Sequence, residues 1–156
     1  MSGHDYRTAL SAAGLELLKH PTVGKYQGFS VVGNTLHVSG HIGWRNGGVS
    51  IVGTLGHDLD VPAGKEAARD AALAALGTVE KALGSLERVR SVPRLFGMVR
   101  ASGTFEQHPA VIDGASEILL TVLGEDAGAH SRSAVGMSSL PFGAAVELEM
   151  MVVFDD

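Results

Sequence analysis

The segment at about residues 62–83 most constrains the fold, because it predicts a long helix whose buried side is made of small residues. Asp60 precedes the segment as an N-cap, Pro62 is compatible with a first helical turn, and Gly84 follows as a C-terminal stop. The expected buried stripe consists of Ala67, Ala71, Ala74, Ala75, Leu76, Val79 and Leu83. A helix with so few bulky side chains can lie close against a β-sheet.

A second helix is predicted at about residues 109–123, where apolar residues recur on one face and Gly124 follows as a stop. Between the two helices, residues 89–100 have the pattern of a long strand. Pro93 lies inside that strand and removes one ladder donor. We therefore expect an edge position or a bulge there.

Short strands are predicted on both sides of this central part. Residues 29–32 and 35–39 form a hairpin around Gly33 and Asn34, and residues 133–137 and 144–154 form a closing pair around the turn at 140–143. Residues 5–19 predict a short peripheral helix, and residues 40–58 predict a loop that includes a short strand at 49–52. The order β-β-α-β-α-β-β favours an α+β fold with both main helices on one face of a mixed sheet.

Length and composition are consistent with one domain over residues 1–156, in which residues 1–20 are a peripheral segment. There is no cysteine, so thiolate chemistry is excluded. The first residues lack the layout of a signal peptide, and no apolar run approaches the ~18 residues of a membrane span. A cytoplasmic protein is therefore expected. The formal net charge of −5 argues against a dedicated nucleic-acid binder.

The closing stretch holds the residues that point to chemistry. Arg132 begins one strand, and Glu147 and Glu149 lie on one face of the next, so an arginine is expected to face two carboxylates. A guanidinium binds a carboxylate through two parallel hydrogen bonds, and a carboxylate can orient or deprotonate a water molecule. The face that carries Glu147 and Glu149 continues with Met151 and Val153. Such a mixed face is typical of a subunit contact with a polar cleft, so we expect an oligomer.

Several segments, in this order, resemble the RidA superfamily of reactive intermediate deaminases, also called YjgF-type proteins or L-PSP endoribonucleases. They are VGKYQ at 23–27, LHVSGH at 36–41, the alanine-rich helix from residue 66, VIDGAS at 111–116, RSAVG at 132–136, LP at 140–141 and VELE at 146–149. The resemblance covers roughly residues 20–154. Within the superfamily, the chain most resembles a divergent group of somewhat longer bacterial members.

The resemblance implies a chorismate-mutase-like fold and a homotrimer with ligand clefts between subunits. It also implies cofactor-free, metal-free hydrolysis of small enamines or imines to carbonyl compounds and ammonia. On this basis Arg132 would bind the substrate carboxylate and Glu147 would serve the catalytic water. Tyr26 and Gly40 would line the cleft, Gly40 through its backbone.

This chain departs from the family pattern at two positions. Ala134 stands where the family often has a cysteine, and Asp113 stands where it commonly has an asparagine. Asp113 would add a negative charge to a substrate-binding cleft meant for an anion. Either it pairs with Arg132, or this group of proteins prefers a different ligand.

Further residues have weaker assignments. His41 follows Gly40 and could serve as an acid or base, and Trp44 could cover the ligand or contact another subunit. Glu149 is expected to be a solvated strand residue. The leading functional hypothesis is an imine or enamine hydrolase, and the alternative is a non-catalytic trimeric module that binds small metabolites or a partner protein. Ribonuclease activity rests on the family label alone and conflicts with the acidic charge balance.

Overall fold

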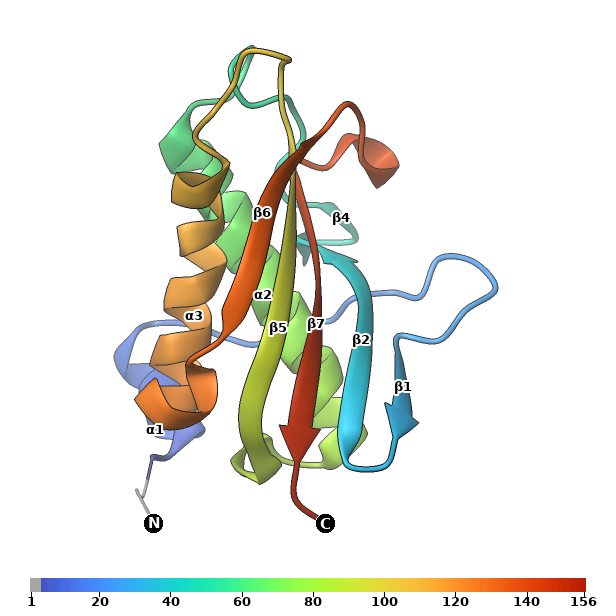
Figure 1. Ribbon diagram of the computed structural model, residues 1–156, viewed down its shortest axis with the longest axis vertical. Helices are drawn as coiled ribbons and strands as arrows, with labels where there is room; N and C mark the ends of the chain where they lie inside the picture. The colour runs from blue at the N-terminus through green and yellow to red at the C-terminus, as the bar shows by residue number, and fades with distance from the viewer. Residues whose placement is uncertain (1–3) are drawn as a thin grey trace.

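A five-stranded mixed sheet forms the centre of the computed structural model, which describes residues 4–156 (Figure 1). Its strands are β1 (Phe29–Val32), β2 (Thr35–Ile42), β5 (Val89–Arg100), β6 (Ser131–Met137) and β7 (Val146–Phe154). They are arranged in the order β1-β2-β7-β5-β6. Only β5 and β6 are parallel, and the other neighbours are antiparallel. A separate small ladder joins β3 (Trp44–Arg45) to β4 (Gly48–Val49).

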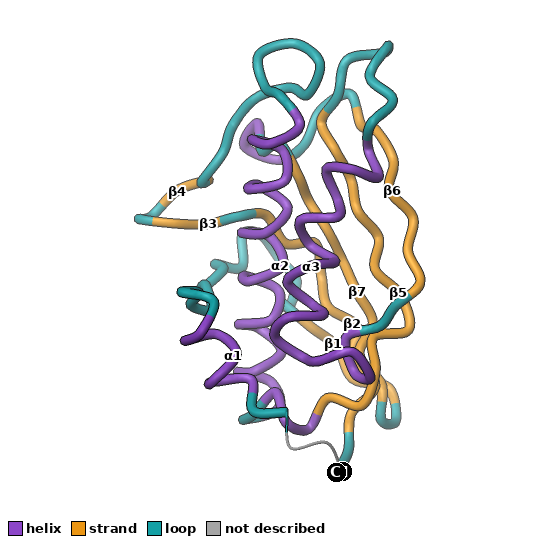
Figure 2. Tube along the Cα trace, turned by 90° about the vertical axis from the view of Figure 1, so that its left-hand side faces the viewer, coloured by secondary structure: helices purple, strands orange, loops and turns teal. Residues whose placement is uncertain are grey.

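Two long helices cover one face of the sheet, as Figure 2 shows. They are α2 (Val61–Leu83) and α3 (His108–Gly128), and a short helix, α1 (Tyr6–Ala12), lies beside them. The side chain of Asp60 caps α2 by accepting a hydrogen bond from the Ala63 amide at 3.0 Å, and Gly84 ends it in a left-handed conformation. The predicted α+β fold, with both main helices on one face, is confirmed.

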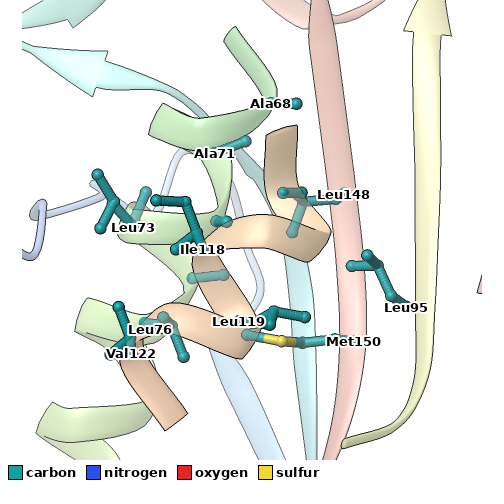
Figure 3. Packing of buried hydrophobic residues seen from close by; sticks show 14 of the residues in the cluster. Ala68, Ala71, Leu73, Leu76, Leu95, Ile118, Leu119, Val122, Leu148 and Met150 are labelled. Carbon is teal, nitrogen blue, oxygen red and sulfur yellow. The ribbon is translucent and has the colours of Figure 1, made fainter. Parts of the chain in front are cut away.

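The core lies between the helices and the sheet (Figure 3). Ala68, Ala71, Leu73 and Leu76 come from α2; Ile118, Leu119 and Val122 come from α3; Leu95, Leu148 and Met150 come from the strands. The small residues of α2 let the helices approach each other closely. A methyl group on Gly114 of α3 would lie 2.3 Å from the backbone oxygen of Lys65 in α2, so glycine is required at this crossing.

The predicted closing hairpin is wrong. β6 and β7 are not neighbours, because β5 lies between them and pairs with both. The turn at 140–143, which contains the short 3₁₀ segment Pro141–Gly143, therefore carries the chain across the end of β5. Parallel pairing of β5 and β6 is possible because α3 forms the crossover between them.

Two other predictions need adjustment. Pro93 is not on an edge strand, since β5 is central, but the register between β5 and β7 shifts between Ser91 and Arg94, so the expected bulge is present. The first helix is shorter than predicted and ends at Ala12. The second main helix continues beyond Gly124, where the backbone is locally non-helical, to Gly128.

Candidate functional site

A bulge in β2 shapes the site around Glu147. Val38 pairs with Met150 and His41 with Leu148, so three steps along β2 correspond to two along β7. The extra residue lets Gly40 face the Glu147 side chain on the side of the sheet away from the helices. A methyl group on residue 40 would lie 2.1 Å from a Glu147 carboxylate oxygen. Glycine at this position therefore leaves the space that the carboxyl group occupies.

A pocket of about 440 Å³ surrounds this carboxyl group. Its walls come from the segment before β1, the β2 bulge, β3, the 141–143 turn and β7. The lining residues are His20, Val23, Tyr26, Ser39, Gly40, Ile42, Trp44, Pro141, Phe142, Glu147 and Glu149. The structure thus brings together four predicted site residues: Tyr26, Gly40, Trp44 and Glu147. Glu149 is exposed, as expected of a solvated strand residue, and it also lines the pocket.

Glu147 is half-buried, and its surroundings shift the pKa of its carboxyl group upward. Burial, and secondarily the negative charge of Glu149, raises the pKa of Glu147. A carboxyl group with a raised pKa exchanges protons more readily near neutral pH than an ordinary surface glutamate. The pocket therefore contains a group suited to general acid–base chemistry.

His41 lies on the other side of β2 from this pocket. The bulge reverses the alternation of side chains, so His41 turns toward α2, where it is 2% exposed. Its Nδ1 donates to the carbonyl of Ser39 at 2.6 Å, and its Nε2 lies 2.7 Å from the hydroxyl of Thr78. The ring of His20 lies 4.4 Å away. His41 is placed to support the β2 bulge rather than to line the Glu147 pocket.

Burial lowers the pKa of His41 to about 4, and this predicts a pH-dependent stability. The unfolded chain binds a proton at His41 below about pH 6.5, whereas the folded chain resists protonation until about pH 4. The free energy of unfolding should therefore fall as pH falls through this window, by up to about 1.4 kcal/mol per pH unit from this group. Urea titrations of the native chain and of His41→Gln from pH 7 to 4 should show a shallower slope for the variant. Equal slopes would contradict the prediction.

Arg132 is held on the helix face by a network with α3. Its Nη2 lies 2.8 Å from a carboxylate oxygen of Asp113 and donates to the carbonyl of Pro109 at 3.1 Å. Its Nη1 donates to the hydroxyl of Ser116 at 2.8 Å. The structure thus places Asp113 beside Arg132, which is the first of the two arrangements that the sequence left open.

Ser116 and His130 extend this network. The Nδ1 of His130 lies 2.7 Å from the carbonyl of Gly128, and because a carbonyl only accepts, Nδ1 carries a proton. In neutral His130, Nε2 is then free to accept from the Ser116 hydroxyl at 2.8 Å. Hydrogen bonds therefore run from Arg132 through Ser116 to His130 and fix the guanidinium beside α3.

Within one chain, Arg132 and Glu147 lie on opposite faces of the sheet. Arg132 is in register with Leu95, a core residue beneath the helices, whereas Glu147 pairs with Ile42, which lines the pocket on the other face. The expectation that the arginine faces the two carboxylates is therefore wrong for a single chain. In a single chain the sheet therefore separates the two residues.

Sequence reasoning missed four residues that the structure places at these two clusters: Ser116 and His130 beside Arg132, and His20 and Phe142 beside Glu147. Ser116 lies within the family-like segment 111–116, which is the one signal that could have singled it out. The two histidines show no metal-type spacing, and nothing in the pattern around Phe142 marks it.

Two further observations on the described residues concern metal binding and membrane spanning. Over residues 4–156, no group of three or more histidine, aspartate or glutamate side chains is arranged to hold a metal ion. Within the same residues, none of the helices combines the length and the apolarity that a membrane crossing needs.

A five-stranded sheet of this order, with two helices on one face, fits the chorismate-mutase-like architecture predicted above. Residues 7–153 match the family described as "YjgF/chorismate_mutase-like, putative endoribonuclease". The chain belongs to this family.

Three similar proteins match most of the chain. The protein TCP17 of Trypanosoma cruzi is 42% identical over 127 residues, which are 81% of this chain and 79% of TCP17. The solved structure of Atu1372 from Agrobacterium tumefaciens, a protein of unknown function, is 39% identical, with a TM-score of 0.89 over 96% of this chain and 92% of that chain. A "putative endoribonuclease" from Shewanella oneidensis is 32% identical, with a TM-score of 0.92 over 96% and 99%.

Proposed function

We propose that this protein hydrolyses a small reactive enamine or imine, without a cofactor, in a cleft between subunits of a homotrimer. The observation that carries the proposal is the half-buried Glu147 carboxyl group, with its raised pKa, in a pocket beside Tyr26 and Gly40. These are the residues that the family resemblance assigns to the cleft.

The chemistry needs only water and a proton carrier. A water molecule adds to the iminium carbon while Glu147 accepts one of its protons, so that a C–O bond forms. Glu147 then returns that proton to the nitrogen and the C–N bond breaks. The proton of the new hydroxyl group passes to the departing ammonia, so that a carbonyl compound and ammonium form. The carboxyl group ends in its starting state. Neither an oxidant nor a metal enters the balance of the reaction.

The oligomer supplies the missing half of the site. In the proposed trimer, the Arg132 face of one subunit meets the Glu147 face of the next, so that the guanidinium anchors the substrate while the carboxyl group serves the water. The mixed polar and apolar strand face of Glu147, Glu149, Met151 and Val153 supports a subunit contact.

The test combines turnover with complementation. Imines of the 2-aminoacrylate type are generated in situ, and the release of ammonia and of keto acid is followed. Arg132→Ala and Glu147→Gln should each be inactive. When the two are unfolded together and refolded, about a quarter of the clefts in a randomly mixed trimer combine a native Arg132 with a native Glu147. Activity should return to about that fraction.

Two results would contradict the proposal. Native protein that accelerates none of several imines would remove the hydrolase function. Two inactive variants that stay inactive after mixing would show that Arg132 and Glu147 do not meet across subunits. Each variant refolded alone is the matched control for recovery during refolding.

One observation favours the alternative of a non-catalytic binding module. The charge of Arg132 is already balanced by Asp113 at 2.8 Å, and the Arg132 side chain is only 22% exposed. An anionic substrate would have to compete with this ion pair. Binding of uncharged metabolites, without ammonia release from any imine, would support the module instead.

A further inference from the structure

One wall of the Glu147 pocket is aromatic. The indole of Trp44 lies edge-on to Phe142, with ring centroids 6.0 Å apart and planes at 80°, and it also lies edge-on to His20 at 6.1 Å. Both contacts have the T-shaped geometry that aromatic rings prefer. Val23 and Tyr26 line the same pocket, and each is 46% exposed. The pocket therefore offers apolar surface to a ligand that enters it.

Trp44 is held in place by its neighbour on β3. Arg45 donates from Nε and Nη2 to one carboxylate oxygen of Asp70 in α2, at 3.1 and 2.8 Å. Asp70 is only 6% exposed, so this ion pair ties β3 to the buried side of α2. Trp44 itself pairs with Val49 in the β3–β4 ladder. Because the indole is positioned in advance, little ordering is needed when a ligand binds against it.

Phe142 is held in a conformation that a large residue rarely adopts. Its φ is 57° and its ψ 18°, in the left-handed region, and the residue is 59% exposed. The turn is fixed at the carbonyl of Gly143, which accepts from Arg100 Nη1 and from the Gly53 amide, both at 3.2 Å. Folding of this chain gains little from an exposed ring in a strained backbone. Such residues concentrate at binding sites.

We propose that the pocket takes a substrate with an aromatic or large branched apolar group, which lies against Trp44 and Phe142 while the reacting C=N carbon lies at Glu147. The position of the reacting carbon rests on the proposed function, whereas the binding of the apolar group against Trp44 and Phe142 does not. A cavity of about 440 Å³ is in the range of sites that hold ligands larger than a three-carbon acid. Trp44 and Phe142 would thus determine specificity.

Trp44 is the only tryptophan of the chain, so its fluorescence reports directly on the pocket. We would titrate the native protein with two stable keto acids that differ by a phenyl group, 2-oxo-4-phenylbutanoate and 2-oxobutanoate. The phenyl acid should change the Trp44 emission at concentrations about ten-fold or more below those of 2-oxobutanoate. Burial of the phenyl ring against apolar side chains should strengthen binding by at least this factor.

The matched variants are Phe142→Gly and Val32→Ala. Glycine suits the positive φ at position 142, so this variant should fold while it lacks the ring. We expect it to lose most of the preference for the phenyl acid. Val32 is a 68% exposed residue of β1 that does not line the pocket, and its variant should keep the preference.

Equal half-saturation by the two acids, or no change in emission with either, would overturn the assignment. Full retention of the preference in Phe142→Gly would also overturn it. A clear phenyl preference combined with no hydrolysis of any imine would support the pocket assignment and remove the proposed reaction. The reverse, rapid hydrolysis with no preference for ring-bearing imines, would keep the reaction and refute the substrate class.

Discussion

Glu147→Gln should lower imine hydrolysis by about 100-fold or more, because the amide can neither accept a proton from water nor return one to nitrogen. The stability of the folded protein should not decrease. Ionised Glu147 is less favourable in the folded chain than in the unfolded chain, as its raised pKa shows, so a neutral side chain of the same shape should leave the free energy of unfolding at pH 7 equal or higher. Steady-state turnover and urea unfolding measure the two effects.

Gly40→Ala provides an independent way to disturb the same carboxyl group. The added methyl would lie 2.1 Å from a Glu147 oxygen and would force the Glu147 side chain to move. Activity should fall in this variant although Glu147 is still present. Glu66→Gln is the matched control, since it removes an exposed carboxylate of α2 that does not line the pocket, and it should retain most of the turnover. Full activity in Glu147→Gln would show that this carboxyl group carries no step of the reaction.

Gly114→Ala should destabilise the protein by about 3 kcal/mol, which is at the upper end of the usual cost of overpacking. In an ordinary helix this change would stabilise by about 1 kcal/mol, because alanine is the better helix former. Here the methyl would lie 2.3 Å from the backbone oxygen of Lys65, and a backbone atom of a second helix cannot move away easily. The steric cost should therefore exceed the gain in helix propensity.

Chemical denaturation of Gly114→Ala and Gly103→Ala tests this prediction. A methyl on Gly103 would meet no atom within 4 Å, so that variant should unfold close to the native midpoint. An unchanged or raised midpoint for Gly114→Ala would mean that α2 and α3 separate at little cost. Because Asp113 precedes Gly114, the strained variant should also disturb the ion pair with Arg132.

Local chemistry made the helices predictable. Asp60 and Gly84 enclose α2 and satisfy its ends as their types suggest, and the alanine stripe faces the core. Strand pairing was harder to predict, because periodicity indicates that a segment is a strand but not which strand lies beside it. Residues 133–137 and 144–154 looked like a hairpin, yet β5 separates them. The contact of Gly114 with α2 is a property of the helix crossing, which the pattern of one helix does not reveal.

For the candidate residues, the sequence indicated some of the neighbours that the structure brings together but not their geometry. Tyr26, Gly40, Trp44 and Glu147 line one pocket, and Asp113 lies beside Arg132. The single-residue bulge in β2 could not be read from the sequence, and it turns His41 into the core. The opposite placement of Arg132 and Glu147 depends on which strand pairs with β6. Because the predicted hairpin was wrong, the expected position of Arg132 relative to Glu147 was also wrong.

Within one chain the sheet separates these two clusters, so their residues do not contact one another. Asp113, Ser116 and His130 surround only Arg132, whereas Trp44 and Phe142 belong only to the Glu147 pocket. Residues that share no partners have nearly independent effects. In the proposed cleft, the groups that would recognise a charge and those that would recognise a hydrocarbon can therefore change separately, so that new substrate combinations arise without a redesign of the fold.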